Sequence, residues 1–321
     1  MNDVAREAGV SVGTVSRCIN GIPVKDASRR RVEAAIQKLN YRVNNYARGF
    51  KTNKTYCVAL ILPSLGIPFF SLLAEEVTAA LNKRGYRMVL MVTNYDSEAE
   101  ATSVSLVRQN KMDGIIALTY NPNIDFDASV PVVSIDRHCG ESTTCVSSDN
   151  FRGGQLAAEG LIARGCRKLL FMRIGSDVAS EVDKRAIGFE SACRARGVAY
   201  EMLIVNDEAT TLPLFRYLEE HTHAGVPDFD GIFCNTDRLA LQMQHKLTEL
   251  GVRVPEDVQL VGFDGVNDYV FGCPPCSTIV QPVAQLAETA VETLFVKDSA
   301  AVPSLICLPV RFEAHGTTKE A

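Results

Sequence analysis

The chain opens with the stretch NDVAREAGVSVGTVSRCING, residues 2–21. Its pattern of small and apolar residues predicts two short helices, over residues 3–8 and 12–19, joined by a tight turn at Gly9. Helices that cross steeply at such a turn leave room only for small side chains, and the turn needs a residue that tolerates positive φ. The residues expected to form this contact and its small core are Val4, Ala5, Ala8, Val10, Val15 and Ile19. The stretch therefore predicts a helix-turn-helix.

The second of these helices carries side chains that suit contact with duplex DNA. We expect Ser11 to cap this helix, and Arg17 lies further along it, where its guanidinium could donate two hydrogen bonds to a guanine edge. Hydroxyl and amide groups nearby suit phosphates, which set position rather than sequence. The residues that we expect at the DNA are Ser11, Val12, Gly13, Thr14, Ser16, Arg17 and Asn20.

The rest of this N-terminal segment is basic. Apolar residues at helical spacing predict a third helix from Asp26, a residue that can serve as its N-cap. Residues 1–54 contain eleven Lys and Arg against four Asp and Glu, a net charge of +7, whereas the whole chain has a net charge of −5. A basic segment on an acidic body indicates a module that binds a polyanion. The alternative is a pair of surface helices within a larger α/β protein.

From Tyr56 onward, apolar strands alternate with amphipathic helices. The strands are expected at 56–62, 87–92, 114–118, 130–135, 168–174, 231–235 and 258–263. The helices are expected at 70–84, 98–110, 151–164, 184–196, 237–250 and 284–295. This alternation predicts parallel sheets that are covered on both faces. Because the segment is too long for one such sheet, we expect an α/β body of two doubly wound lobes.

Composition limits the class of protein. A hydrophobic content of 46% and a charged content of 22% are typical of a soluble globular chain. No apolar run is long enough to cross a bilayer, and the first residues lack the order of a secretory signal, so we expect a cytoplasmic protein. The ten cysteines lie mostly in apolar runs and are interpreted as small hydrophobes. The pair in CPPC, residues 273–276, could be a redox pair, although a structural loop is favoured.

The motifs together resemble one family. The opening stretch, followed by RRRVEAAIQKLNYRVNNYAR at residues 29–48, looks like the headpiece of the lactose/galactose repressor (LacI/GalR) family of bacterial transcription regulators. The resemblance continues through IPFF at 67–70, SIDR at 134–137, SDNFRGG at 148–154 and FCNTDRLA at 233–240. It covers essentially the whole chain. It implies a periplasmic-binding-protein-like body, with a DNA operator and a small-molecule effector of the carbohydrate class as partners.

The resemblance also implies a homodimer whose hinge helix, over about residues 44–52, enters the minor groove. The hinge residues implied at DNA are Asn44, Ala47, Arg48 and Phe50, with Phe50 as the intercalating wedge. The division expected from this comparison is a headpiece over 1–54, an N-terminal lobe over 55–148 and 282–311, a C-terminal lobe over 149–281, and a tail over 312–321. The tail has no apolar heptads, so no tetramerising coiled coil is expected.

Ligands of doubly wound lobes bind at the carboxyl ends of the strands. By resemblance, Arg185 and Asp264 are the best candidates, since a guanidinium makes bidentate contacts and a carboxylate accepts two hydroxyl hydrogen bonds from a sugar. Phe69 or Phe70 would stack on the apolar face of a ring. The remaining candidates are Asn94, Asp136 and Thr236, while Asp149 and Asp237 are as readily helix caps.

The sequence disfavours several other functions. The chain lacks a Gly-x-Gly-x-x-Gly after a strand, a Gly-x-Ser-x-Gly elbow and a Walker A motif, so we expect no enzyme and no cofactor. A metal at His221-x-His223 is disfavoured because the surrounding sequence is typical of a helix end. A freestanding sugar-binding protein would have no use for residues 1–54. The alternative that stays open is a ligand-binding sensor with weak or lost DNA binding.

Overall fold

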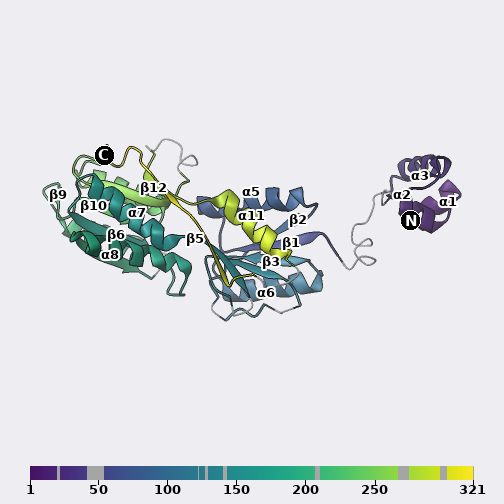
Figure 1. The fold of residues 1–321 in the computed structure, drawn as a ribbon, viewed down its shortest axis with the longest axis horizontal. Helices are drawn as coiled ribbons and strands as arrows, with labels where there is room; N and C mark the ends of the chain where they lie inside the picture. Colours follow the sequence, from purple (N-terminus) through teal and green to yellow (C-terminus); the bar gives the residue numbers. More distant parts are fainter. Residues whose placement is uncertain are drawn as a thin grey trace. The chain divides into compact units, whose positions relative to one another are not determined.

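A computed structural model describes residues 1–19, 22–41, 54–121, 123–126, 129–139, 143–206, 210–266, 275–296 and 302–320. The chain divides into two compact units, Met1–Thr55 and Tyr56–Ala321 (Figure 1). Within the described residues, none of the helices is both long enough and apolar enough to cross a membrane.

The first unit is a bundle of three short helices. They are α1 (Asn2–Ala8), α2 (Val12–Ile19) and α3 (Asp26–Lys38). Gly9 ends α1 with φ at 60°, the left-handed conformation that the tight turn requires. Ser11 Oγ accepts a hydrogen bond from the Thr14 amide at 3.2 Å, so the predicted cap on α2 is confirmed.

The predicted cap on α3 is wrong. Asp26 is the first helical residue, and Lys25 stands at the N-cap position without a side-chain hydrogen bond. The Asp26 carboxylate still lies in the first turn, where the helix dipole favours negative charge.

The core of the first unit is small. The buried residues are Val4, Ala5, Ala8, Val15, Val32 and Ala35. Val10 and Ile19, which the sequence places in this core, pack against it while half-buried. Three of the six buried side chains are alanines, so the helices approach closely while little apolar area is removed from water.

The second unit contains two six-stranded sheets, each with helices on both faces, and these form its two lobes. In the first sheet the strand order is β13-β5-β4-β3-β1-β2, and every neighbouring pair is parallel. Its strands are β1 (Cys57–Leu62), β2 (Arg87–Val92), β3 (Gly114–Ala117), β4 (Val132–Ile135), β5 (Thr144–Ser148) and β13 (Leu305–Leu308). Its helices are α5 (Pro68–Lys83), α6 (Ser97–Gln109) and α11 (Val283–Leu294).

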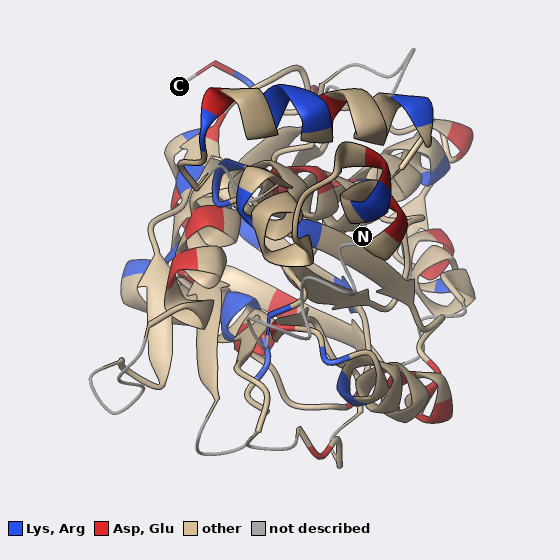
Figure 2. Cartoon of the chain, turned by 90° about the vertical axis from the view of Figure 1, so that its right-hand side faces the viewer, with Lys and Arg blue, Asp and Glu red and all other residues tan. Residues whose placement is uncertain are grey.

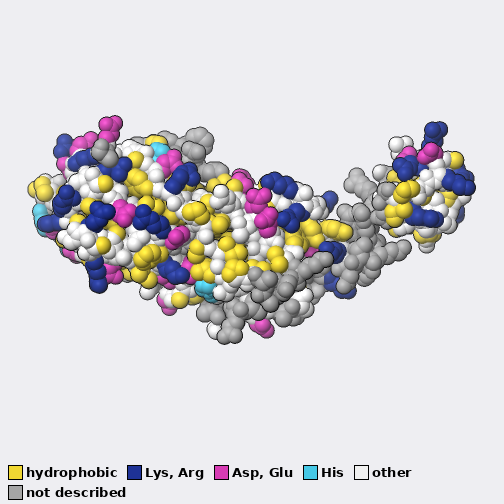
Figure 3. All heavy atoms as spheres, in the orientation of Figure 1, with side chains coloured by type: hydrophobic (Ala, Val, Ile, Leu, Met, Phe, Trp, Pro, Cys, Tyr) yellow, Lys and Arg dark blue, Asp and Glu magenta, His cyan; other side chains and the backbone are white. Residues whose placement is uncertain are grey.

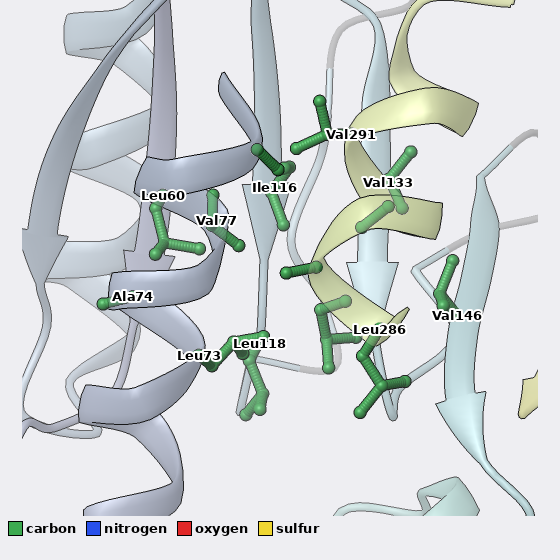
Figure 4. Close-up of a cluster of buried hydrophobic side chains, with 14 of the residues drawn as sticks. Leu60, Leu73, Ala74, Val77, Ile116, Leu118, Val133, Val146, Leu286 and Val291 are labelled. Carbon is green, nitrogen blue, oxygen red and sulfur yellow. The ribbon is translucent and has the colours of Figure 1, made fainter. Parts of the chain in front are cut away.

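Alternate residues of β1 point to opposite faces of this sheet, as strand geometry requires. Leu60 belongs to a buried cluster that also includes Leu73 and Val77 of α5 and Leu286 of α11 (Figure 4). Ile61 joins the cluster under α6 on the other face. The sheet is therefore buried on both sides, as the continuous apolar strands predict.

The second sheet has the order β14-β12-β11-β10-β6-β7, parallel except for the β12–β14 pair. Its strands are β6 (Lys168–Ile174), β7 (Ala199–Val205), β10 (Gly231–Cys234), β11 (Gln259–Asp264), β12 (Ser277–Val280) and β14 (Arg311–Glu313). Its helices are α7 (Asn150–Ala163), η1 (Glu181–Asp183), α8 (Lys184–Arg196), α9 (Leu212–Glu220) and α10 (Asp237–Glu249). A two-stranded ribbon, β8 (Thr222–His223) with β9 (Val226–Pro227), follows α9.

The described chain passes between the two lobes at three places. These lie between β5 and α7, between β12 and α11, and between β13 and β14. Residues 312–321, set apart as a tail by the sequence, instead belong in part to the second lobe. Phe312 and Glu313 lie in β14, and buried Thr317 donates a hydrogen bond to the Leu260 carbonyl at 2.6 Å. Paired backbone and a satisfied hydroxyl hold this segment against the sheet.

Candidate nucleic-acid interface and ligand cavity

Helix α2 and the residue before it expose several of the residues that were expected at DNA. Ser11, Val12, Gly13 and Arg17 are exposed, and Val12 is 41% exposed although it is apolar. Thr14 and Ser16 are half-buried. An exposed valine at the start of a helix that also carries an exposed arginine suits contact with a thymine methyl group and a guanine edge.

The N-terminal unit is covered with cations. Arg29, Arg30 and Arg31 are exposed on α3, and Lys25 is exposed beside its first turn. Figure 3 shows dark blue Lys and Arg side chains over the surface of this unit, and Figure 2 marks Lys and Arg positions along its helices in blue. Lys38 forms an ion pair with Glu7 at 2.6 Å, and Arg6 pairs with Asp3. The expected DNA contacts at Asn20, Asn44, Ala47, Arg48 and Phe50 lie outside the described residues.

The second unit contains a cavity of about 410 Å³ between its two lobes. Its volume lies within the range of small-molecule sites, roughly 300–1,000 Å³. The first lobe contributes Ser64, Ile67, Phe69, Phe70, Tyr95, Leu118, Tyr120, Asp136 and Arg137. The polar residues contributed by the second lobe and the crossover are Arg173, Ser176, Ser180, Arg185, Thr210, Thr211, Asn235, Thr236, Arg238, Gln242, Asp264 and Gln281.

Six of the seven expected ligand residues line this cavity. They are Phe69, Phe70, Asp136, Arg185, Thr236 and Asp264. Asn94 is the exception: it is exposed in the turn after β2 with φ at 52°, outside the set of described residues that line the cavity. Its neighbour Tyr95 lines the cavity instead. Phe69 and Phe70 both belong to the core and to the cavity wall, with ring centroids 5.9 Å apart.

Arg185 is held by the protein itself. Its Nε donates to Asn150 Oδ1 at 2.7 Å, and its Nη1 donates to the Asn235 carbonyl at 2.6 Å. The guanidinium carbon lies 3.5 Å from the centroid of the Phe263 ring. These contacts compensate a cation that is only 3% exposed and fix the plane of the guanidinium at the cavity wall.

Two buried carboxyl groups lie beside this arginine. Asp264 Oδ1 lies 3.9 Å from Arg185 Nη1 and accepts a hydrogen bond from Gln281 Nε2 at 2.8 Å. Asp136 Oδ1 accepts one from Ser147 Oγ at 2.6 Å. Burial raises the pKa of both carboxyl groups, well above its usual value for Asp264, and the charge of Arg185 offsets only part of this effect. Ligand hydroxyls that donate to these groups would favour their charged forms.

Asp149 and Asp237, each of which could be a ligand residue or a helix cap on sequence grounds, have different roles in the structure. Asp149 caps α7 by accepting from the Arg152 amide at 2.9 Å. The cap on α10 is Thr236, whose Oγ1 accepts from the Leu239 amide at 3.2 Å. Asp237 instead accepts from the Gly265 amide at 2.8 Å and the Val266 amide at 2.9 Å. Asp237 therefore fixes the loop after Asp264, and it is a positioning residue.

Several polar residues at the cavity were not anticipated. They are Tyr95, Tyr120, Arg137, Arg173, Arg238 and Gln281. Arg173 could have been identified from the sequence, because an arginine lies near the carboxyl end of the otherwise apolar strand KLLFMRI. Arg137 directly follows Asp136 and could have been identified in a similar way. Tyr120 and Gln281 lie in loops, where periodicity gives no information about which side chains face a ligand.

The chemistry of the other candidate sites is limited. Among the described residues, no group of three or more His, Cys, Asp or Glu could hold a metal ion. His221 follows the last residue of α9, in agreement with the helix end expected there. In the CPPC motif, Cys273 lies outside the described residues, while Cys276 is buried and burial raises its thiol pKa to about 12. Such a thiol is a poor nucleophile.

Comparison with known proteins matches both units. A family model described as bacterial regulatory proteins, lacI family, matches residues 1–44. A second, described as periplasmic binding proteins and sugar binding domain of LacI family, matches residues 55–312. The chain is 32% identical to the ribose operon repressor of Lactococcus lactis subsp. lactis (strain IL1403), over 100% of this chain and 98% of that one.

Two further relatives extend this comparison. The sucrose operon repressor of Lactococcus lactis subsp. lactis is 33% identical over 92% of each chain. A crystal structure of the lac repressor dimer bound to operator and the anti-inducer ONPF superposes with a TM-score of 0.82 and 26% identity, covering 98% of each chain.

Proposed function

The chain belongs to the LacI family of bacterial transcription regulators, a family of DNA-binding repressors rather than enzymes, and from this premise we propose which DNA contacts and which ligand class it uses. The observation that carries the proposal is the pairing of an exposed, basic helix-turn-helix with a polar cavity in one chain. We propose that α2 reads a major groove through Arg17 and Val12. The flanking Thr14 and Ser16 would position the helix on phosphates.

We propose that the effector is a sugar or sugar derivative, bound between the lobes. The named relatives are repressors of ribose and sucrose operons, and the cavity here has the mixture of aromatic and charged groups that suits a polyhydroxylated ring. Asp264, Asp136 and Arg185 would bond hydroxyls, while Phe69 or Phe70 covers the apolar ring face.

Binding between the lobes offers a route to control. Three contacts already join them: the Glu181 amide donates to the Asp136 carbonyl at 2.9 Å, Arg137 Nη1 donates to the Val178 carbonyl at 2.9 Å, and His138 Nε2 lies 3.0 Å from Glu181 Oε1. A ligand that prefers one lobe arrangement changes operator affinity, and operator changes ligand affinity by the same factor.

The same proposal includes the assembly and the division of the chain. We propose a homodimer, as in the lac repressor structure, because one helix-turn-helix reads only half of a symmetric site. The proposed division is a headpiece over 1–54, with a hinge at about 44–52, and two lobes, over 55–148 with 282–310 and over 149–281 with the segment from β14 onward. A protein of this function would act in the cytoplasm.

The test is selection of duplexes from a random library by the full-length protein, followed by affinity measurement over a series of salt concentrations. A true operator binder enriches a near-palindromic sequence and loses roughly 0.9 log units of affinity per log unit of salt for each phosphate contact. Arg17→Ala should cost about 1–3 kcal/mol and relax preference at one base pair. The matched control is Arg196→Ala, at an exposed arginine that ends α8.

Two outcomes would count against this function. Enrichment of no sequence would leave a ligand-binding sensor without operator binding. An equal loss of affinity on every sequence in Arg17→Ala would make Arg17 a phosphate contact and remove it from base recognition.

A further inference from the structure

The cavity has two chemically different ends, and strand order separates them. At one end of the cavity, β11 ends at Asp264 and the neighbouring β12 is followed by Gln281. Both residues lie near buried Arg185. The other end of the cavity is lined by residues that follow β10, β6 and β7, which are neighbours in the sheet in that order. Arg173 lies near the carboxyl end of β6, and Arg238 lies in the first turn of α10, which follows β10. Both arginines line the cavity.

The cations in the cavity outnumber the anions. Among the described residues, the lining contains four arginines, Arg137, Arg173, Arg185 and Arg238, and two acidic residues, Asp136 and Asp264. Arg185 lies near Asp264, and Arg173 Nη2 lies 2.9 Å from Asp183 Oδ1. The net charge of the cavity lining therefore depends on Arg137 and Arg238.

Arg137 and Arg238 have no carboxylate partner within 4 Å in the part of the chain that the structure describes. Arg137 donates to the Val178 carbonyl, and its guanidinium carbon lies 3.7 Å from the centroid of the Tyr120 ring. Arg238 is exposed and makes no hydrogen bond or ion pair with a described residue. The half-buried Tyr120 ring and the Val178 carbonyl stabilise the Arg137 cation without an ion pair, so the lining of the cavity retains more cations than carboxylates.

Hydroxyl donors line the same end. Ser176 Oγ accepts from the Val178 amide at 3.0 Å, and Thr210 Oγ1 accepts from the Leu212 amide at 3.2 Å. Each hydroxyl therefore keeps its own proton for donation. Arg173 Nη2 also donates to the Ser176 carbonyl at 2.8 Å, which holds the guanidinium beside this loop. Arginines with hydroxyl donors form the usual set of ligands for a phosphate or a carboxylate.

On the premise of the function proposed above, we propose that the effector is a sugar derivative with an anionic group, a phosphate ester or a carboxylate. The anion lies at the end of the cavity formed by Arg173 and Arg238, with Arg137 as the cation contributed by the first lobe. The hydroxyls of the sugar lie toward Asp264 and Arg185. A neutral sugar of the same size would leave Arg137 and Arg238 without a counter-charge in the cavity.

The test is isothermal titration of the full-length protein, without DNA, at constant ionic strength. The probes are D-ribose, D-ribose 5-phosphate and D-ribonate, and D-glucose, D-glucose 6-phosphate and D-gluconate. We expect at least one anionic derivative to bind about tenfold or more tightly than its parent sugar, the factor that one charge-assisted hydrogen bond supplies. The ester and the acid arms distinguish phosphate from carboxylate.

Arg238→Gln should lower the ratio between the affinities of derivative and parent roughly tenfold. The matched control, Arg196→Gln, removes a distant exposed arginine and should leave that ratio unchanged. The proposal is overturned if no derivative binds more tightly than its parent, or if Arg238→Gln leaves the ratio as it was. In that case, operator selection by the same protein would still support the proposed function, because selection needs no ligand. If selection enriched no duplex while the protein still preferred the anionic derivatives, operator binding would be refuted and the proposed ligand class would stand.

Discussion

Asp264 lies at the last position of β11, where its backbone has a φ of 129° and its carboxyl group is 5% exposed. Burial raises its pKa well above the usual value, and nearby Asp237 acts in the same direction, while Arg185 opposes both. The net direction means that the folded protein disfavours the charged carboxylate. A ligand with hydroxyl donors would reverse this preference, so the residue is suited to binding rather than to stability.

Asp264→Asn should increase the free energy of unfolding of the ligand-free protein, and this increase should grow as the pH rises. A folded pKa above the unfolded value gives a contribution that is present below the unfolded pKa, about 3.9, and lost as pH rises through the folded pKa. The amide removes that loss, so the free energy of unfolding at about pH 8 should rise by roughly 1 kcal/mol or more, with a smaller gain at about pH 4.5. Urea unfolding at the two pH values measures the difference, and the variant should lose sugar binding.

Asp257 provides the control of opposite sign. Its hydrogen bonds from Arg253 hold the pKa of that carboxyl at about 2, so its contribution is present above the unfolded pKa and lost as pH falls. Asp257→Asn should therefore lower stability at neutral pH. If both asparagine variants changed stability in the same direction with pH, the burial argument for Asp264 would be refuted.

Single residues differ in how far their sequence context predicts their role. Asp149 precedes α7 and Asp237 is the first residue of α10, yet only Asp149 is a cap. The Asp237 carboxylate instead accepts hydrogen bonds from the Gly265 and Val266 amides. That choice depends on an approach between segments far apart in the chain. At Gly262 an added Cβ would lie 2.3 Å from Asp237 Oδ1, a constraint that no local pattern contains.

Helices α7 and α8 show how one element pair supports the cavity. An added Cβ on Gly154 would lie 2.0 Å from the Arg185 carbonyl oxygen, and one on Gly188 would lie 1.9 Å from the Phe151 carbonyl oxygen. The two backbones are therefore in direct contact, and the Asn150–Arg185 hydrogen bond of 2.7 Å spans the same pair of helices. The spacing of these helices sets the position of the Arg185 guanidinium.

Gly188→Ala should separate α7 from α8, because backbone atoms cannot rotate away as a side chain can. We expect the free energy of unfolding to fall by about 1–3 kcal/mol or more, with weaker ligand binding as Arg185 shifts. Chemical denaturation and titration measure the two effects. The matched control is Gly13→Ala in α2, where the nearest neighbouring atom is 3.7 Å from the added Cβ. There the same change should be neutral or gain up to about 1 kcal/mol. Equal effects at both positions would refute the close-packing argument.

Elements with strong periodicity were predicted well. The expected bounds of β2, β6 and α8 agree with the structure to the residue. Strands β5 and β7 were missed for different reasons. β5, with the sequence TCVSS, is buried mainly by tertiary packing rather than by apolar composition. β7 is an edge strand with alternating exposure, and the glutamate within AYEMLIV weakens its pattern. Helix α9 is short, and it was recognised only by its end.

At the scale of the whole molecule, the two units differ greatly in core size. The first has six small buried side chains, whereas the second has two buried sheets with helices on each face. The change in charge and periodicity near residue 55 predicted the boundary between them, because each unit has its own composition. The cavity between the lobes was less predictable, since it joins residues from both sheets. Its expected members came chiefly from family resemblance, and the extra arginines came from the structure.

This difference predicts two unfolding transitions for the free full-length protein in scanning calorimetry, with the N-terminal unit melting first. A unit of this size buries a smaller fraction of its surface than a larger domain does, and it is marginally stable alone. Val15→Ala should lower only the first transition, by a destabilisation of about 1–3 kcal/mol, and Val77→Ala should lower only the second, since both valines are fully buried. The first shift should be larger, because one kcal/mol moves the melting temperature of a small domain by about 4–8 °C and that of a larger one by about 2–4 °C. A single transition that both variants lower equally would show that the two units unfold as one cooperative unit, and the prediction would be wrong.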